Sequence, residues 1–134
     1  VYAKDGLLKF VYNVLGIEEF IATSDSAVPE GTHQVRAEFA YDGGGLGKGG
    51  DVTLYCDGDA IGTGRIGGTQ PMVFSADETT DIGYESGTPV GSEYDLVSSK
   101  FSGKIHWVQI DLEKDDHDHI ISPEERFRLA MARQ

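Results

Sequence analysis

Apolar residues occupy every second position along several short stretches of the chain, and this period of two is the pattern of β-strands. Residues 35–41 and 52–56 show the alternation most clearly. The same pattern, interrupted by turn-forming residues, predicts further strands at residues 1–4, 7–14, 17–23, 60–66, 72–74, 80–84 and 101–112. About nine short strands in close succession predict an all-β fold, either an antiparallel β-sandwich or a barrel.

Three dipeptides mark tight turns between the predicted strands: Asp5-Gly6, Leu15-Gly16 and Asp57-Gly58. Glycine adopts a positive φ without steric cost, and Asp tolerates one, so these residues suit the turns of hairpins. We therefore expect residues 1–23 to form a meander and residues 52–66 to form a hairpin.

The C-terminal part of the chain has a different pattern. Residues 113–121 are a charged linker rich in Asp and His, whereas residues 122–134 have a helical pattern with one apolar face. Ser122 and Glu125 have the spacing of a capping box, and Pro123 suits the first turn. The sequence thus predicts a β-domain at residues 1–112, a linker and a short helix that docks on a protein surface.

Residues 41–51, YDGGGLGKGGD, have the spacing of a phosphate-binding glycine loop. Such loops bind phosphate because they lead from a strand into a helix, whose N-terminal N–H groups hold the anion. Here a strand is predicted on both sides, and Gly49 occupies the position of the Mg²⁺-binding Ser or Thr. The stretch is therefore predicted to connect two antiparallel strands and not to bind a nucleotide.

Composition narrows the possible partners. The chain has 134 residues, which suits one domain, and its formal net charge is −12. This acidity disfavours nucleic acids and anionic membranes as partners. No apolar run has the length of a membrane-spanning helix. The single cysteine excludes a disulfide within the chain.

Two motifs resemble those of the laminin-G-like, concanavalin-type sandwich: DVTLYCDGDAIGTGRI at residues 51–66 and FSGKIHWVQIDL at residues 101–112. A longer ordered set, FAYDGGGLGKGG, VTLYCDGD, PMVFSADETTDIG, GTPV and FSGKIHWVQIDL, resembles the C-terminal accessory domain of large bacterial arylsulfatases. The tail DDHDHIISPEERFRLAMARQ is similar to tails in the same group. The resemblance covers about residues 2–134 and implies a concanavalin A-like jelly roll whose first strands precede Val1.

The resemblance also implies a role. In the parent enzymes an upstream domain carries a Cys-x-(Pro/Ala/Ser)-x-Arg motif, which supplies the formylglycine nucleophile, and holds a Ca²⁺-type ion. Cys56 is followed by Gly58 and Ala60 at the two diagnostic positions, so the motif is absent here. We therefore expect no catalytic residue and no cofactor in this chain. Its expected partner is the catalytic domain of the same polypeptide, in the bacterial periplasm or cytoplasm.

Three roles for such a domain stay open. It could pack on the catalytic domain, shape substrate access or mediate homo-oligomer contacts, and missing strands would favour self-association. It could instead be a lectin-like module that binds sulfated glycans, or a purely structural unit without a ligand. Glycosidase activity is not expected, because no predicted strand carries the paired carboxylates of a glucanase.

Two groups of acidic and imidazole side chains are candidate metal ligands. Asp77, Glu78, Asp81 and Glu85 lie in one loop-rich stretch, and loop carboxylates suit Ca²⁺. The same residues could simply cap turns and keep the loop solvated. His117 and His119, among Asp115, Asp116 and Asp118, have the ligand types for Zn²⁺ or Ni²⁺, although charged tails collect such residues without forming a site.

Aromatic residues are the candidates for sugar binding. Tyr55, Tyr84 and Tyr94 could stack on sugar rings if they lined a concave face. Trp107 lies in an apolar strand pattern, so we expect it in the core. Cys56 alternates with apolar residues and has acidic neighbours, so we expect a buried core thiol and not a nucleophile.

Overall fold

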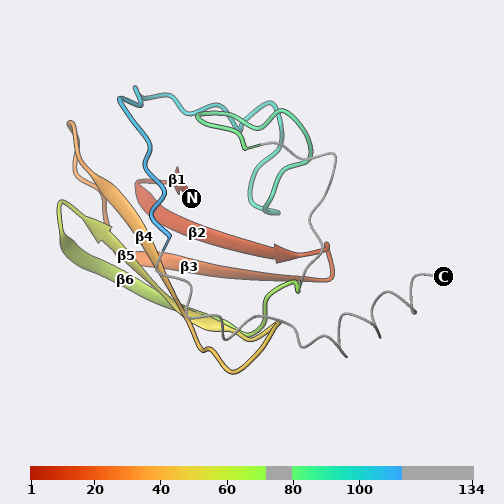
Figure 1. The fold of residues 1–134 in the computed structure, drawn as a ribbon. Helices are drawn as coiled ribbons and strands as arrows, with labels where there is room; N and C mark the ends of the chain where they lie inside the picture. Colours follow the sequence, from red (N-terminus) through yellow and green to blue (C-terminus); the bar gives the residue numbers. More distant parts are fainter. Residues whose placement is uncertain (72–79, 113–134) are drawn as a thin grey trace.

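Residues 1–71 and 80–112 are the part of the chain that the computed structural model describes. They form two three-stranded antiparallel sheets and contain no helix, so the predicted all-β class is confirmed (Figure 1). The first sheet has the order β1-β2-β3, with strands at Tyr2–Lys4, Leu7–Val14 and Glu18–Ala27. The second has the order β4-β5-β6, with strands at Val35–Tyr41, Gly50–Cys56 and Asp59–Ile66.

The turns that join these strands lie where the sequence predicts them. Both central residues have positive φ in the three predicted turns, at Asp5 and Gly6, Leu15 and Gly16, and Asp57 and Gly58. This combination is typical of type I′ turns, whose twist matches that of the strands they connect. The glycine loop at residues 41–51 also connects two paired strands, β4 and β5, as expected.

Leu15 is the exception among these turn residues, because a branched apolar residue rarely adopts positive φ. Its φ is 54°, and its side chain is 64% exposed, so little packing offsets the backbone cost. We expect Leu15→Asn to stabilise the protein by about 1 kcal/mol, since Asn tolerates this conformation better. Urea unfolding would measure the gain. Leu15→Ala, which removes the same apolar surface but keeps the unfavourable φ, is the control, and a loss of stability in Leu15→Asn would contradict the argument.

The core lies between the two sheets. Every second residue of β5 faces the first sheet, and together with β6 this strand contributes the largest fully buried side chains, Val52, Leu54 and Ile66. They pack against Leu8 of β2 and Ala22 of β3. The two sheets are therefore held together mainly by apolar contact across this interface.

Two glycines let β6 approach β3 very closely. A Cβ atom on Gly64 would lie 2.4 Å from the Cβ atom of Ala22, and one on Gly62 would lie 2.7 Å from the Cα atom of Ser24. Neither position has room for a side chain, because the neighbouring atoms belong to the backbone or to a methyl group fixed to it. The close packing of β6 on β3 therefore requires the two glycines of the Gly-Thr-Gly sequence in β6, whose role is not only backbone flexibility.

The Ser24 hydroxyl accepts a backbone hydrogen bond at a bulge in the first sheet. The register between β2 and β3 shifts between Leu7 and Lys9. The Leu8 N–H donates to Ser24 Oγ at 3.0 Å, and the Ser24 hydroxyl donates to the Ser26 carbonyl at 2.8 Å. The buried hydroxyl therefore takes the place of a ladder carbonyl that the bulge removes.

Residues 90–94 lie against the outer face of the first sheet. Lys9 Nζ lies 2.6 Å from Glu93 Oε1, and the Tyr2 hydroxyl donates to Glu93 Oε2 at 2.7 Å. The hydrogen bond from Lys9, followed by that from Tyr2, holds the pKa of the Glu93 carboxyl below its ordinary value. The rings of Tyr2 and Tyr94 pack edge to face, with centroids 4.9 Å apart.

Two predicted strands are not found. Residues 80–84 form no strand and bend at residues 82–84. Residues 101–112 run without pairing to any strand of the two sheets, although their alternation predicts a strand. A strand requires a hydrogen-bonded neighbour, and alternation does not supply one. Strand β3 is also longer than predicted, ending at Ala27. The predicted strand at residues 72–74, the linker and the C-terminal helix lie outside the described residues.

Candidate functional site

The predicted acidic metal site is described only in part, because Asp77 and Glu78 lie outside the described residues. Asp81 Oδ2 accepts hydrogen bonds from the Ser86 amide and hydroxyl, both at 2.7 Å. Glu85 accepts a hydrogen bond from the Tyr94 hydroxyl. Both carboxylates are therefore hydrogen-bond acceptors within the loop.

The three tyrosines predicted to bind sugar do not lie together. Tyr55 faces outward from the second sheet, and the guanidinium carbon of Arg36 lies 3.9 Å from its ring centroid. Tyr94 packs on Tyr2 at the outer face of the first sheet, on the other side of the molecule. Tyr84 is exposed in the connecting segment. The structure therefore does not bring the tyrosines into one groove.

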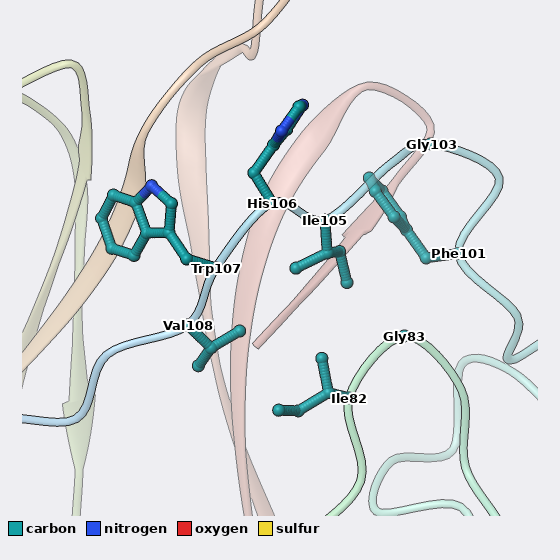
Figure 2. A pocket seen from close by; sticks show the side chains of 8 residues that line it. All are labelled: Ile82, Gly83, Phe101, Gly103, Ile105, His106, Trp107 and Val108. Atoms are coloured by element: carbon teal, nitrogen blue, oxygen red, sulfur yellow. The ribbon is translucent and has the colours of Figure 1, made fainter.

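An open pocket of about 430 Å³ lies between two connecting segments (Figure 2). One wall is formed by Ile82 and Gly83 and the other by residues from Phe101 to Val108. The Phe101 amide donates to the Gly83 carbonyl at 2.8 Å, which fixes the two walls together. Ile82 and Ile105 face each other across the pocket, whereas Trp107 points away from them. The lining combines apolar side chains with exposed backbone, and His106 is the one titratable side chain among the lining residues.

The segment of residues 101–112 presents its apolar side chains to solvent. Trp107 is 61% exposed, so the prediction that it lies in the core is wrong. Ile110 is 74% exposed and Leu112 is 89% exposed. Tryptophan burial depends on a partner strand or sheet, and in this structure no described strand pairs with the segment. Several large apolar side chains exposed within one segment are a feature of interaction sites.

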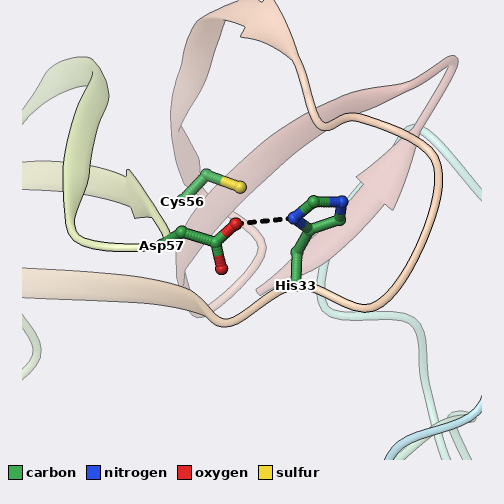
Figure 3. A group of neighbouring side chains, drawn as sticks. All are labelled: His33, Cys56 and Asp57. Atoms are coloured by element: carbon green, nitrogen blue, oxygen red, sulfur yellow. Dashed lines mark hydrogen bonds and ion pairs between the residues drawn. The ribbon is translucent and has the colours of Figure 1, made fainter.

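A second cluster of chemical interest joins His33, Cys56 and Asp57 (Figure 3). Cys56 ends β5 and Asp57 begins the following turn, while His33 belongs to the connection before β4. His33 Nδ1 lies 2.6 Å from Asp57 Oδ2, and one donor atom from each of the three residues lies within 4.8 Å of the others. Within residues 1–71 and 80–112, this is the one place where three or more His, Cys, Asp or Glu side chains bring their donor atoms this close together.

The electrostatics of this cluster oppose a free thiolate. The hydrogen bond from His33 lowers the pKa of Asp57, and the same bond raises the pKa of His33. Burial, followed by the charges of Asp57 and Asp59, raises the pKa of the Cys56 thiol. Cys56 is only 8% exposed, so its predicted burial is confirmed. A buried, protonated thiol beside carboxylates is a poor nucleophile.

Sequence reasoning identified Cys56 and the Asp57-Gly58 turn but missed His33. The proximity of His33 to Cys56 and Asp57 follows from the pairing of β4 with β5, in which Val35 lies opposite Cys56. Residues just before β4 must therefore lie beside residues just after β5. A histidine two positions before one strand and a Cys-Asp pair at the end of the next is the signal that could have revealed the cluster.

The two antiparallel sheets, the exposed apolar segment and the His-Cys-Asp cluster define an all-β domain without a recognised catalytic arrangement in its described residues. No protein-family model, curated protein or solved structure matches the chain. In the described residues, no helix is long and apolar enough to cross a membrane.

Proposed function

We propose that this chain is a non-catalytic domain that binds another protein surface through residues 101–112. The observation that carries the proposal is the exposure of Trp107, Ile110 and Leu112 along one extended segment. Transferring apolar side chains of this size from water into an interface contributes roughly 1.5–3 kcal/mol each when they become fully buried. A protein surface that supplies a matching apolar face would bury these side chains, and a strand edge would pair with the backbone of a segment that joins neither of the two sheets.

The proposed partner is the catalytic domain of an arylsulfatase encoded in the same polypeptide. The ordered motifs that resemble the C-terminal domain of bacterial arylsulfatases support this choice of partner. In this proposal the two observed sheets belong to a larger concanavalin-type sandwich. The formylglycine nucleophile and the Ca²⁺-type ion belong to the partner domain, which performs the sulfate-ester hydrolysis.

A lectin-like role has one observation in its favour, the open pocket beside the exposed Trp107. The net charge of −12 argues against it, because an acidic surface repels sulfated glycans. A second copy of the chain could also cover the apolar segment, as the sequence-based expectation of self-association suggests. Both alternatives are outcomes of the test described next.

The test uses the region upstream of this chain in its natural open reading frame, produced as a separate protein. We expect that region to contain Cys-x-(Pro/Ala/Ser)-x-Arg and to bind the 134-residue chain in calorimetric titration. Ile110→Asp should weaken binding at least about tenfold, because it buries a charge at the contact. Leu15→Asp, at an exposed apolar site elsewhere, is the matched control.

Three results would contradict the proposal. The open reading frame could lack the sulfatase motif, or the upstream region could fail to bind. Ile110→Asp could also bind as tightly as the control. Light scattering of the chain alone identifies self-association, and titration with a sulfated oligosaccharide identifies the lectin-like role.

A further inference from the structure

The pairing of β4 with β5 brings His33 to the end of β5. The Asp57 amide donates to the Gln34 carbonyl at 2.8 Å, and the Gln34 amide donates to Asp57 Oδ1 at 2.9 Å. These two bonds fasten the connection before β4 to the turn after β5. His33 is therefore held beside the Cys56-Asp57 pair by the sheet and not by a flexible loop (Figure 3).

The imidazole of His33 is oriented from both sides. Its Nδ1 atom faces Asp57 Oδ2, and its Nε2 atom lies 3.3 Å from the Glu30 carbonyl oxygen. Gly31, with a φ of 127°, lies against the ring, and a Cβ atom there would lie 3.3 Å from Nε2. In metal-bound histidines, one ring nitrogen typically donates to a carbonyl or carboxylate oxygen while the other ring nitrogen binds the metal. The contacts of His33 suit this arrangement.

We propose that His33 Nδ1, Cys56 Sγ and Asp57 Oδ2 bind a divalent transition metal ion, and that zinc fits this ligand set best. Imidazole, thiolate and carboxylate are the three ligand types that zinc uses in proteins. Around a tetrahedral zinc ion their donor atoms would lie roughly 3.3–3.6 Å apart. The Nδ1–Oδ2 separation is 2.6 Å, and all three donor atoms lie within 4.8 Å of one another. These atoms would therefore move by on the order of 1 Å to reach tetrahedral distances.

Both nitrogens of His33 face oxygen acceptors, Nδ1 toward Asp57 Oδ2 and Nε2 toward the Glu30 carbonyl. A divalent ion would take the place of the proton at Nδ1 and of the proton on Cys56 Sγ, and the thiolate and the carboxylate would balance its two positive charges. The Nε2–H bond to Glu30 persists. Water completes the fourth position, since Asp57 is half-exposed and the cluster opens to solvent on that side.

A simpler interpretation is that Asp57 caps its own turn and His33 merely pairs with it. That interpretation accounts for the hydrogen bonds of Asp57 and leaves Cys56 as a buried core thiol that faces the pair (Figure 3). The two interpretations differ in one measurable property: only a metal site converts Cys56 to a metal-bound thiolate.

Cobalt(II) titration of the purified, tag-free 134-residue chain tests the proposal. We expect a near-ultraviolet sulfur-to-cobalt charge-transfer band and intense visible bands of tetrahedral cobalt, both removed by one equivalent of zinc. Cys56→Ser should abolish the charge-transfer band. Asp57→Asn, which keeps a residue that tolerates the positive φ of the turn, should weaken binding at least about tenfold. Circular dichroism of each variant verifies that it is folded.

The histidines of the C-terminal tail provide the control, because they could bind the same ions. The double variant His117→Gln and His119→Gln should keep the charge-transfer band and its affinity. The proposal is overturned if wild-type protein shows no such band, or if zinc and cobalt binding is lost in the tail variant and retained in Cys56→Ser. Neither result bears on the proposed protein contact at residues 101–112.

Discussion

Gly64→Ala should destabilise the protein by roughly 3 kcal/mol, because β3 leaves no room for a methyl group on β6. The new Cβ atom would lie 2.4 Å from the Cβ atom and 2.9 Å from the Cα atom of Ala22, which is 1% exposed. Neither atom can rotate away, so the two sheets would have to separate. For a domain whose total stability is about 5–15 kcal/mol, this loss is severe. Urea unfolding at constant pH would measure it.

Two further variants distinguish the loss of stability caused by the steric clash at Gly64 from the general effect of replacing a glycine. Gly68→Ala is the matched control, since its nearest contact would be an ordinary 3.5 Å from the Gly47 carbonyl oxygen, and it should change stability little. Adding Ala22→Gly to Gly64→Ala moves the methyl group from β3 to β6 and should recover part of the loss. Equal unfolding midpoints for Gly64→Ala and Gly68→Ala would refute the close approach of the sheets.

Leu54→Ala is expected to have a comparably large effect, about 2–5 kcal/mol. Leu54 is 0% exposed and belongs to the core cluster between the sheets, so truncation removes apolar contacts and leaves a cavity. Thr53→Ala, on the opposite face of the same strand, should cost far less. Chemical denaturation of both variants tests the orientation of β5. A Thr53→Ala loss that equals or exceeds that of Leu54→Ala would mean that the register of this strand is reversed.

The parts of the fold that depend on neighbours in sequence could be predicted. Asp5-Gly6 and Asp57-Gly58 fix tight turns through their own backbone preferences, and the adjoining strands pair with the next strand along the chain. Alternation within β5 also predicted the burial of Cys56 correctly. These features need no knowledge of distant contacts, which explains why the pattern of residues was sufficient.

The parts that depend on distant neighbours could not be predicted. Trp107 has the alternation of a buried strand, but whether it is buried depends on which surface lies against it. The site containing His33 depends on the register that places Val35 opposite Cys56, which no local pattern specifies. Similarly, the close contact of the β6 glycine Gly64 with Ala22 is a property of the packed sheets.

The protein contact at residues 101–112 is the central claim, and its single tryptophan offers the most direct test. Incorporation of 5-fluorotryptophan gives the 134-residue chain one fluorine resonance, from Trp107. We predict that this resonance shows the solvent isotope shift of an exposed indole in the dilute chain, and that saturation with the unlabelled upstream region moves it and removes most of the isotope shift. A resonance that is already shielded in the dilute chain, or that does not change on saturation, would contradict the account.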